Sequence, residues 1–273
     1  MTQKRIYTEM ERIEKWNNSE VMRACLGLID LTSLNSTDTV SKIDSMVEKV
    51  NSFQENFKGY PSVAAICVYP NFASTVKRNL KERGVKIAVV GGVFPSSQSF
   101  LNIKEEECKA AVGQGADEVD IVLALSHFLA GEYEEAANEI RVIKKACGKA
   151  HLKVILETGA LTPEQIERAS MLAMEAGADF IKTSTGKMEP AATPEAARIM
   201  CSSIKKYYET TGKMVGFKPA GGIVTPDEAI LYYSIVDSIL GEKWLNPEFF
   251  RLGASRLANN LLTKLENRTI NYF

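Results

Sequence analysis

The chain has 273 residues, of which 45% are hydrophobic, and a formal net charge of -1. This length allows one large barrel or two small domains, and the composition is ordinary for a globular protein. Lysines and arginines are scattered rather than gathered into a basic face or polybasic tract, which argues against nucleic acid and anionic membranes as partners.

Short apolar runs rich in β-forming residues alternate with segments of helical periodicity. The predicted strands cover residues 26–30, 64–68, 86–90, 118–122, 152–156, 180–183, 214–218 and 249–252. Apolar residues at helical spacing, often with proline near the start, predict helices over 40–56, 72–83, 133–150, 163–177, 194–208 and 226–240. A strand followed by a helix, repeated in this way, indicates parallel pairing.

Parallel strands need covered faces and right-handed crossovers, so eight such units predict an α/β fold with one closed TIM barrel. A doubly wound sheet is the alternative, but no Gly-x-Gly-x-x-Gly motif follows the first strand to support dinucleotide binding. We expect a helical extension over residues 1–20, packed over the lower end of the barrel. The barrel itself covers 21–265, and a C-terminal tail, disordered by default, covers 266–273.

The N-terminus, the cysteines and the histidines indicate the cellular compartment and the kinds of site to expect. Residues 1–9 run into a charged amphipathic stretch, and no later segment has the apolar length that spans a bilayer, so we expect a cytoplasmic protein. The five cysteines are odd in number and lack metal-ligand spacing, which predicts reduced thiols. The two histidines, His127 and His151, have no motif of a zinc site or catalytic triad around them.

Two lysines end two of the predicted strands, Lys182 within residues 179–187 and Lys218 within residues 215–222. Burial disfavours an ammonium group and a second cation nearby repels it, so both effects favour the neutral amine that attacks a carbonyl. A single lysine at a strand end more often keeps its head in water. The pair therefore favours Schiff-base catalysis on a phosphorylated sugar. We assign the nucleophile to Lys182, although the pattern also permits the reverse assignment.

Other polar residues fall at strand ends, where barrel enzymes place their chemistry: Asp30, Asp120, Glu157, Lys182 and Lys218. Asp120 lies between valine and isoleucine, so its carboxylate needs a cation, which Lys218 or Lys153 could supply. The functional interpretation of Asp120 is a proton relay, and the structural one is an ion pair inside the barrel. We assign supporting positions to Asp30, Thr32, Lys153 and Cys67. Asp30 would orient water or a hydroxyl group, or only tie down the first loop.

Cys67 lies within the run 64–70 and is interpreted as a buried small hydrophobe, since the sequence shows no histidine or cationic partner for it. If the thiol faces the cavity, aldehydes could modify it.

Three loops indicate a phosphate site, namely residues 184–187, 220–222 and 253–256. Glycines let backbone N–H groups approach an anion, and the helix that begins after residue 253 adds its dipole. Each glycine could instead serve turn geometry alone. Their convergence after the seventh and eighth strands, where barrels often bind phosphate, favours the functional interpretation. The predicted phosphate-binding residues are Thr185, Gly186, Lys187, Gly221, Gly222, Gly253, Ser255 and Arg256.

Six segments, taken in this order, resemble the deoxyribose-phosphate aldolases, a family of class I aldolases. They are residues 28–32, 64–70, 115–120, 153–159, 179–187 and 216–222. The resemblance implies that Lys182 forms a Schiff base with acetaldehyde, that Asp120 and Lys218 exchange protons, and that no metal or organic cofactor takes part. It also implies reversible cleavage of 2-deoxy-D-ribose 5-phosphate into D-glyceraldehyde 3-phosphate and acetaldehyde, in deoxyribose phosphate catabolism. The implied assembly is a cytoplasmic homo-oligomer, with a dimer favoured.

The chain departs from the family pattern in three places. Val224 stands where many relatives carry arginine, whereas Arg256 stands where relatives often have serine or threonine. We hypothesise that Arg256 restores the phosphate charge lost at Val224, the alternative being a solvent-exposed arginine at a helix start. Residues 89–95 are looser than the usual glycine-phenylalanine-proline turn of the third loop. Some relatives end in a tyrosine that enters the site, and Tyr272 is the corresponding candidate here.

The sequence is also compatible with three other functions. Another Schiff-base aldolase or a transaldolase would use the same amine with a longer donor. A phosphosugar isomerase or epimerase barrel would use a carboxylate base and form no covalent adduct. A catalytically silent barrel would bind a phosphorylated metabolite without turnover, which the lysine pair argues against.

Overall fold

Eight parallel strands form the centre of the computed structural model, which describes residues 11–273. They are β1 (Ile29–Thr32), β2 (Ala65–Val68), β3 (Lys86–Gly91), β4 (Glu118–Val122), β5 (His151–Ile155), β6 (Phe180–Lys182), β7 (Gly216–Lys218) and β8 (Leu252–Ala254). Their order is β7-β6-β5-β4-β3-β2-β1-β8. The parallel bridges Phe217–Phe250 and Ala220–Gly253 bring the two ends of this sheet together. The predicted TIM barrel is thereby confirmed.

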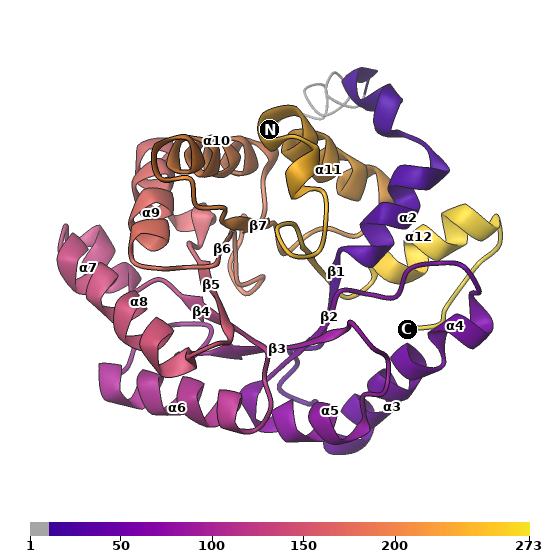
Figure 1. The fold of residues 1–273 in the computed structure, drawn as a ribbon, viewed down its shortest axis with the longest axis horizontal. Coiled ribbons are helices and arrows are strands. Elements are labelled where there is room, and N and C mark those ends of the chain that lie inside the picture. Colours follow the sequence, from indigo (N-terminus) through magenta and orange to yellow (C-terminus); the bar gives the residue numbers. More distant parts are fainter. Residues whose placement is uncertain (1–10) are drawn as a thin grey trace.

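Helices surround the strands as an outer ring (Figure 1). The α-helices are α2 (Ser19–Gly27), α3 (Val40–Asn51), α4 (Phe53–Asn56), α5 (Ala73–Asn79), α6 (Leu101–Gly113), α7 (Leu125–Leu129), α8 (Tyr133–Cys147), α9 (Pro163–Glu175), α10 (Pro194–Thr211), α11 (Pro226–Leu240) and α12 (Leu257–Glu266). The 3-10 helices are η1 (Glu11–Trp16), η2 (Pro70–Phe72), η3 (Thr158–Ala160) and η4 (Glu242–Trp244). These helices cover the outward faces of the parallel strands.

Three of these helices begin with the same local signal. Thr162, Thr193 and Thr225 each precede a proline and accept a hydrogen bond from a backbone N–H of the first turn. Threonine satisfies a donor that has no partner within the helix, and proline at the first helical position loses no hydrogen bond. This sequence chemistry explains why the predicted starts of α9, α10 and α11 are correct.

A repeated Gly-Ala-Asp sequence aligns two strands with their neighbours. Asp117 accepts a hydrogen bond from the backbone N–H of Ile87 (2.9 Å), and Asp179 accepts one from that of Leu152 (2.7 Å). Each carboxylate precedes its own strand and binds the strand before it in the chain. The register of β3 with β4 and of β5 with β6 is therefore reinforced by side chains as well as by the backbone ladder.

The structure corrects several predicted boundaries. The first strand begins at Ile29, since Leu26 belongs to α2, whose first turn is capped by the Asn18 side chain. The eighth strand begins at Leu252 rather than at residue 249. The predicted helix 40–56 is divided into α3 and α4. Apolar periodicity does not distinguish the end of a helix from the strand that follows it, because both bury apolar residues.

The barrel interior is divided into two parts of different chemistry. On β2 and β3 the alternate residues Ala65, Cys67, Ala88 and Val90 form a small apolar cluster with Leu34. Strands β1 and β4 to β7 direct buried charged residues inward, as described below. The larger apolar core lies between the strands and the helices, as expected for strands covered on their outer face.

The segment before the barrel packs on its helical ring. Trp16 in η1 donates its indole N–H to Asp237 in α11 (2.7 Å), and α2 contacts both α11 and α12. Residues 1–10 of the predicted extension lie outside the described residues. Within residues 11–273, no helix combines the length and the apolar character needed to cross a membrane.

The C-terminal tail is ordered, so the expectation of disorder is wrong. Tyr272 and Phe273 both contact the ring of Phe53, and their backbone N–H groups donate to the Asn259 side chain (2.9 Å each). The Tyr272 hydroxyl donates to the carbonyl of Lys49 (2.8 Å), near the end of α3. Because α3 runs antiparallel to β1, this contact lies away from the carboxyl ends of the strands.

Deleting Tyr272 and Phe273 should lower the free energy of unfolding by about 3 kcal/mol, because three aromatic contacts with Phe53 and Phe57 are lost at about 1 kcal/mol each. Urea denaturation of the truncated and full chains measures the change. Replacing the exposed Asn271 with alanine is the control and should leave the midpoint in place. Equal midpoints for the truncated and full chains would contradict the packing role of the tail.

Candidate active site

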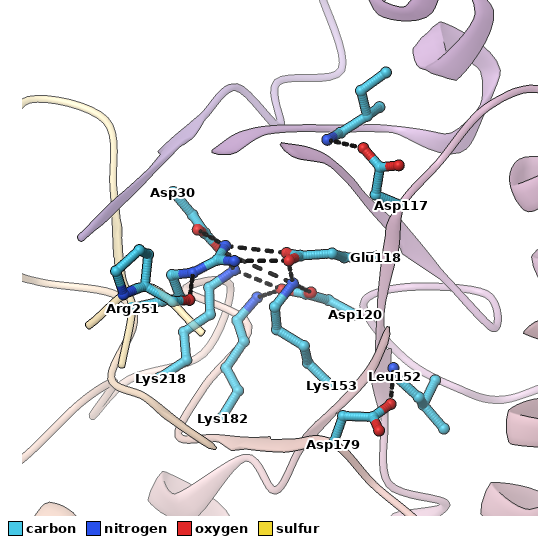
Figure 2. Close-up of polar contacts among 12 residues, drawn as sticks. Asp30, Asp117, Glu118, Asp120, Leu152, Lys153, Asp179, Lys182, Lys218 and Arg251 are labelled. Atoms are coloured by element: carbon cyan, nitrogen blue, oxygen red, sulfur yellow. Dashed lines mark hydrogen bonds and ion pairs between the residues drawn. The ribbon is translucent and has the colours of Figure 1, made fainter. Parts of the chain in front are cut away.

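Lys182 and Lys218 meet at one carboxylate oxygen inside the barrel. Lys182 Nζ donates to Asp120 Oδ2 at 2.8 Å, and Lys218 Nζ donates to the same oxygen at 2.7 Å. The side chains come from β6, β7 and β4. Lys182 and Lys218 are direct neighbours in the register of β6 and β7, so both project from the same side of the sheet. Figure 2 shows the lysine heads converging on Asp120.

This contact belongs to a larger network of buried charges, each at most 3% exposed. Lys153 in β5 donates to Asp120 Oδ1 (3.0 Å) and to Glu118 (2.5 Å). Lys218 also forms an ion pair with Asp30 in β1 at 2.5 Å. Both cations that the sequence offers for Asp120 are therefore in place, and Asp30 joins the same network. Arg251, just before β8, completes it through Asp30 and Glu118.

The two lysines differ in their electrostatic surroundings. Burial lowers the pKa of Lys182, and the Lys218 charge lowers it further, against the opposing effect of Asp120. Burial also disfavours the charged form of Lys218, but Asp120 and Asp30 together raise the pKa of Lys218 above its ordinary value. Burial alone would raise the pKa of Asp120, but Lys153, Lys182 and Lys218 hold that pKa well below its usual range. Of the two lysines, Lys182 therefore loses its proton more readily than Lys218.

A cavity of about 280 Å³ opens above Lys182 at the carboxyl ends of the strands. Among the described residues, its lining contains Lys182 but not Lys218. It also contains Thr32 and every predicted phosphate-binding residue, which are Thr185, Gly186, Lys187, Gly221, Gly222, Gly253, Ser255 and Arg256. The three predicted loops therefore surround one cavity. The amine exposed to it is that of Lys182, which has fewer carboxylate partners than Lys218.

Contacts between loops hold the wall of this cavity. Glu157, which follows β5 with a positive φ of 53°, accepts hydrogen bonds from the Thr185 backbone N–H (3.1 Å) and hydroxyl (2.5 Å). Thr185 Oγ1 in turn accepts from the Lys187 backbone N–H (3.0 Å). The Lys187 ammonium donates to the carbonyl of Leu34 (2.6 Å), which connects the sixth loop to the first.

Two glycines in the cavity wall are required for space. At Gly221, where φ is +84°, an added Cβ would lie 2.6 Å from Ala191 Cβ and 3.2 Å from Gly186 Cα. At Gly253 it would lie 2.7 Å from Ala220 Cβ and 3.2 Å from Lys218 Cε. Gly221 therefore lets the sixth and seventh loops approach each other, and Gly253 leaves room for the stem of Lys218.

Cys67 is fully buried in the small apolar cluster, in agreement with its interpretation as a hydrophobe, and burial raises the pKa of its thiol. All five cysteines are free thiols. The looser third loop places Phe94 against Tyr69 at the edge of the same cluster. The positive φ of Val93 (61°) is supported by its N–H, which donates to Glu107 (2.7 Å). Within residues 11–273, no group of three potential metal-ligating side chains occurs.

Sequence reasoning missed two members of the network, Glu118 and Arg251. Glu118 lies two residues before Asp120, and the period of a strand places both on the same face, so this signal was present in the sequence. Arg251 immediately precedes β8, which begins three residues later than predicted. Glu157 was noted at a strand end, and the structure shows its contact with Thr185.

The geometry can be compared with known proteins. The DeoC/LacD family of aldolases matches residues 25–241. Human deoxyribose-phosphate aldolase is 40% identical over 91% of this chain and 81% of its own length. A Caenorhabditis elegans protein, provisionally given the same name, is 44% identical over 91% of this chain and 82% of its own. The tetrameric deoxyribose phosphate aldolase from Aeropyrum pernix has a similar fold, with a TM-score of 0.71 and 22% identity over 97% of this chain and 98% of its own.

The family match and the relatives place this barrel among the lyases of the aldolase class. The chain belongs to the DeoC/LacD aldolase family.

Replacing Gly253 with alanine should destabilise the protein by about 1–3 kcal/mol, because the new methyl group overlaps Ala220 and crowds Lys218. Denaturant unfolding measures the effect. Gly113→Ala in α6 is the matched control, since its methyl group meets open space and alanine is the better helix former. If both variants gained stability equally, the close packing around Gly253 would be disproved.

Proposed function

We propose that the chain is a deoxyribose-phosphate aldolase that cleaves 2-deoxy-D-ribose 5-phosphate reversibly into D-glyceraldehyde 3-phosphate and acetaldehyde. The observation that carries the proposal is the Lys182 amine, which enters the cavity while Asp120 and the Lys218 ammonium lie against it. The names of the human and nematode relatives support the same substrate. Amine, carboxylate and water suffice for the proposed chemistry, so it requires no metal or organic cofactor.

The proposed reaction begins when neutral Lys182 attacks the aldehyde carbon of the open-chain sugar. The carbinolamine then loses water, for which its hydroxyl group must gain a proton, and the proposed source is the Lys218 ammonium, acting through Asp120. The product is an iminium ion that can accept the electron pair of the breaking bond. Because Lys218 shares Asp120 with Lys182, a proton can pass among the three groups without leaving the buried network.

Bond cleavage follows from the iminium ion. Loss of the proton from the C3 hydroxyl forms the aldehyde of glyceraldehyde 3-phosphate as the C2–C3 bond breaks. The bonding electrons leave an enamine on Lys182, and protonation at C2 then gives the iminium ion of acetaldehyde. Water adds to this ion, acetaldehyde departs, and the free amine returns. Asp120 and Lys218 are proposed to hold and return the protons in these steps.

Replacing Lys182 with arginine should lower kcat for cleavage at least about a thousandfold, because the guanidinium is not a nucleophile near neutral pH. Borohydride reduction with acetaldehyde should add one ethyl group to Lys182 of the parent protein, as located by peptide mapping. Lys205→Arg on the exposed face of α10 is the control and should react like the parent. Trapping at another side chain would refute the assignment.

The same experiment separates the rival functions. An aldolase or transaldolase with a longer donor would be trapped better with dihydroxyacetone phosphate than with acetaldehyde. An isomerase or a silent binding barrel would give no trapped lysine.

The phosphate of the substrate is proposed to bind among the glycine loops, opposite Lys182. Gly221 and Gly222 have positive φ values, and α12 begins at this wall with Arg256 as its N-cap residue. The Arg256 side chain makes no capping bond to the helix. Backbone N–H groups and the helix dipole therefore favour an anion here. Arg256 adds a positive charge to the same wall, in place of the arginine that many relatives carry at the position of Val224.

Replacing Arg256 with serine should raise KM for the phosphorylated sugar about tenfold, because one charged contact to phosphate is lost. Steady-state kinetics with 2-deoxyribose, which has no phosphate, is the control and should show no change. Adding Val224→Arg to the Arg256→Ser variant should restore part of the affinity. An unchanged KM in Arg256→Ser would show that Arg256 does not compensate for Val224.

The assembly state is also proposed rather than observed. We propose a cytoplasmic homo-oligomer, with a dimer favoured. The described surface exposes large apolar side chains, including Phe100 (79% exposed) and Leu129 (51% exposed), of the kind that contacts between subunits cover. The tetrameric relative from Aeropyrum pernix supports assembly in general but not a dimer.

A further inference from the structure

In the buried network, Arg251 contacts Asp30 and Glu118 (Figure 2). Its guanidinium donates to Asp30 Oδ1 (2.7 Å) and to both oxygens of Glu118 (2.7 and 3.0 Å). It also lies over the ring of Phe180, at 5.8 Å from the centroid. Among the described residues that line the cavity, Lys182 is present and Arg251 is not. Any effect of Arg251 on a substrate must therefore pass through its partners.

The network has one more base than it has acids. Its carboxylates are Asp30, Glu118 and Asp120, and its bases are Lys153, Lys182, Lys218 and Arg251. Three cations would balance the three carboxylates, and a fourth would leave a net positive charge in the barrel interior. A buried unbalanced charge is strongly unfavourable. The network is therefore neutral when one base gives up its proton.

Lys182 is the base whose deprotonation fits the contacts best. An arginine side chain does not lose its proton in proteins, so Arg251 stays charged. Lys153 and Lys218 each bind two or more carboxylates, whereas within residues 11–273 Lys182 binds Asp120 alone. With Arg251 holding Glu118 and one oxygen of Asp30, the other two lysines suffice for the remaining negative charge.

We propose that Arg251 is a positioning residue that keeps Lys182 uncharged by neutralising Glu118 and Asp30. Without its guanidinium, Lys153 and Lys218 would have to balance three carboxylates, and the remaining negative charge would favour an ammonium at Lys182. The inference deepens the proposed function, since it rests on Lys182 being the nucleophile.

The groups that act on the Lys182 amine come from five strands and the segment before β8. Asp120 on β4, Lys218 on β7 and Cys67 on β2 act on it directly. Behind them lie Lys153 on β5, Asp30 on β1 and Glu118 on β4, through which Arg251 acts. The Cys67 thiol stays protonated because burial raises its pKa, so it adds no charge to this count.

Four variants test the charge count. Arg251→Met removes one cation and should raise the pKa of Lys182, whereas Glu118→Gln removes one anion and should lower it. The double variant Arg251→Met/Glu118→Gln restores the balance and should return the pKa of Lys182 toward that of the parent protein. Arg251→Lys keeps the charge but loses the paired contacts to Glu118, so it should reduce stability with little effect on the amine.

The pKa of Lys182 is measured through its reaction with pentane-2,4-dione. The neutral amine condenses with one carbonyl group, water is lost, and the enaminone formed absorbs in the ultraviolet. The initial rate is recorded against pH, with Lys182→Arg as the background. The acid limb of this profile should move up by about one pH unit in Arg251→Met and down by a similar amount in Glu118→Gln.

Two results would overturn the proposal. One is an unchanged profile in folded Arg251→Met, which would mean that a carboxylate takes up the proton instead. The other is movement of both single variants in the same direction, as expected from a general structural disturbance. If Arg251→Met does not fold, the proposal is tested by the other two variants: the acid limb must move down in Glu118→Gln and return toward the parent position in the double variant. Failure of the proposed function itself looks different, because the parent protein would then react no faster than Lys182→Arg.

Discussion

Inside the barrel, the two oxygens of Asp120 accept hydrogen bonds from three lysines that belong to three different strands. A carboxylate and an ammonium removed from water are each unstable alone, so these groups stabilise the interior only when all are assembled. The arrangement of β4 to β7 is therefore tied to one charge cluster. Close packing elsewhere protects it from water, since the lysines and Asp120 are almost fully buried.

The network extends from an inert end, formed by Arg251 and Glu118, to an end that faces the cavity. At the inert end, Arg251 and Glu118 pair through two hydrogen bonds and give up no proton near neutral pH. At the cavity end, Lys182 has one carboxylate partner among the described residues. The lowered pKa of Lys182 follows from its burial and from Lys218 beside it. The reactivity proposed for Lys182 would thus depend on the whole network.

Residues without side-chain bulk make this arrangement possible. An added Cβ at Gly216 would lie 2.3 Å from the ring of Phe180, so the glycine leaves the space that the ring fills beneath Lys153 and Arg251. Gly253 does the same for the Lys218 stem. On the opposite side of the barrel, alanines and Cys67 occupy the interior. Long charged side chains therefore extend across the barrel without steric overlap.

The sequence encodes the repeated strands and helices, because apolar periodicity and threonine-proline helix starts are local signals. It also determined that Lys182, Lys218 and Asp120 end or occupy strands of one barrel, and hence that they share its interior. The three-dimensional arrangement settles which lysine faces the cavity, that Arg251 joins the network, and that Tyr272 packs on α3 and α4. These outcomes depend on register and side-chain direction across strands far apart in the chain, which no local pattern encodes.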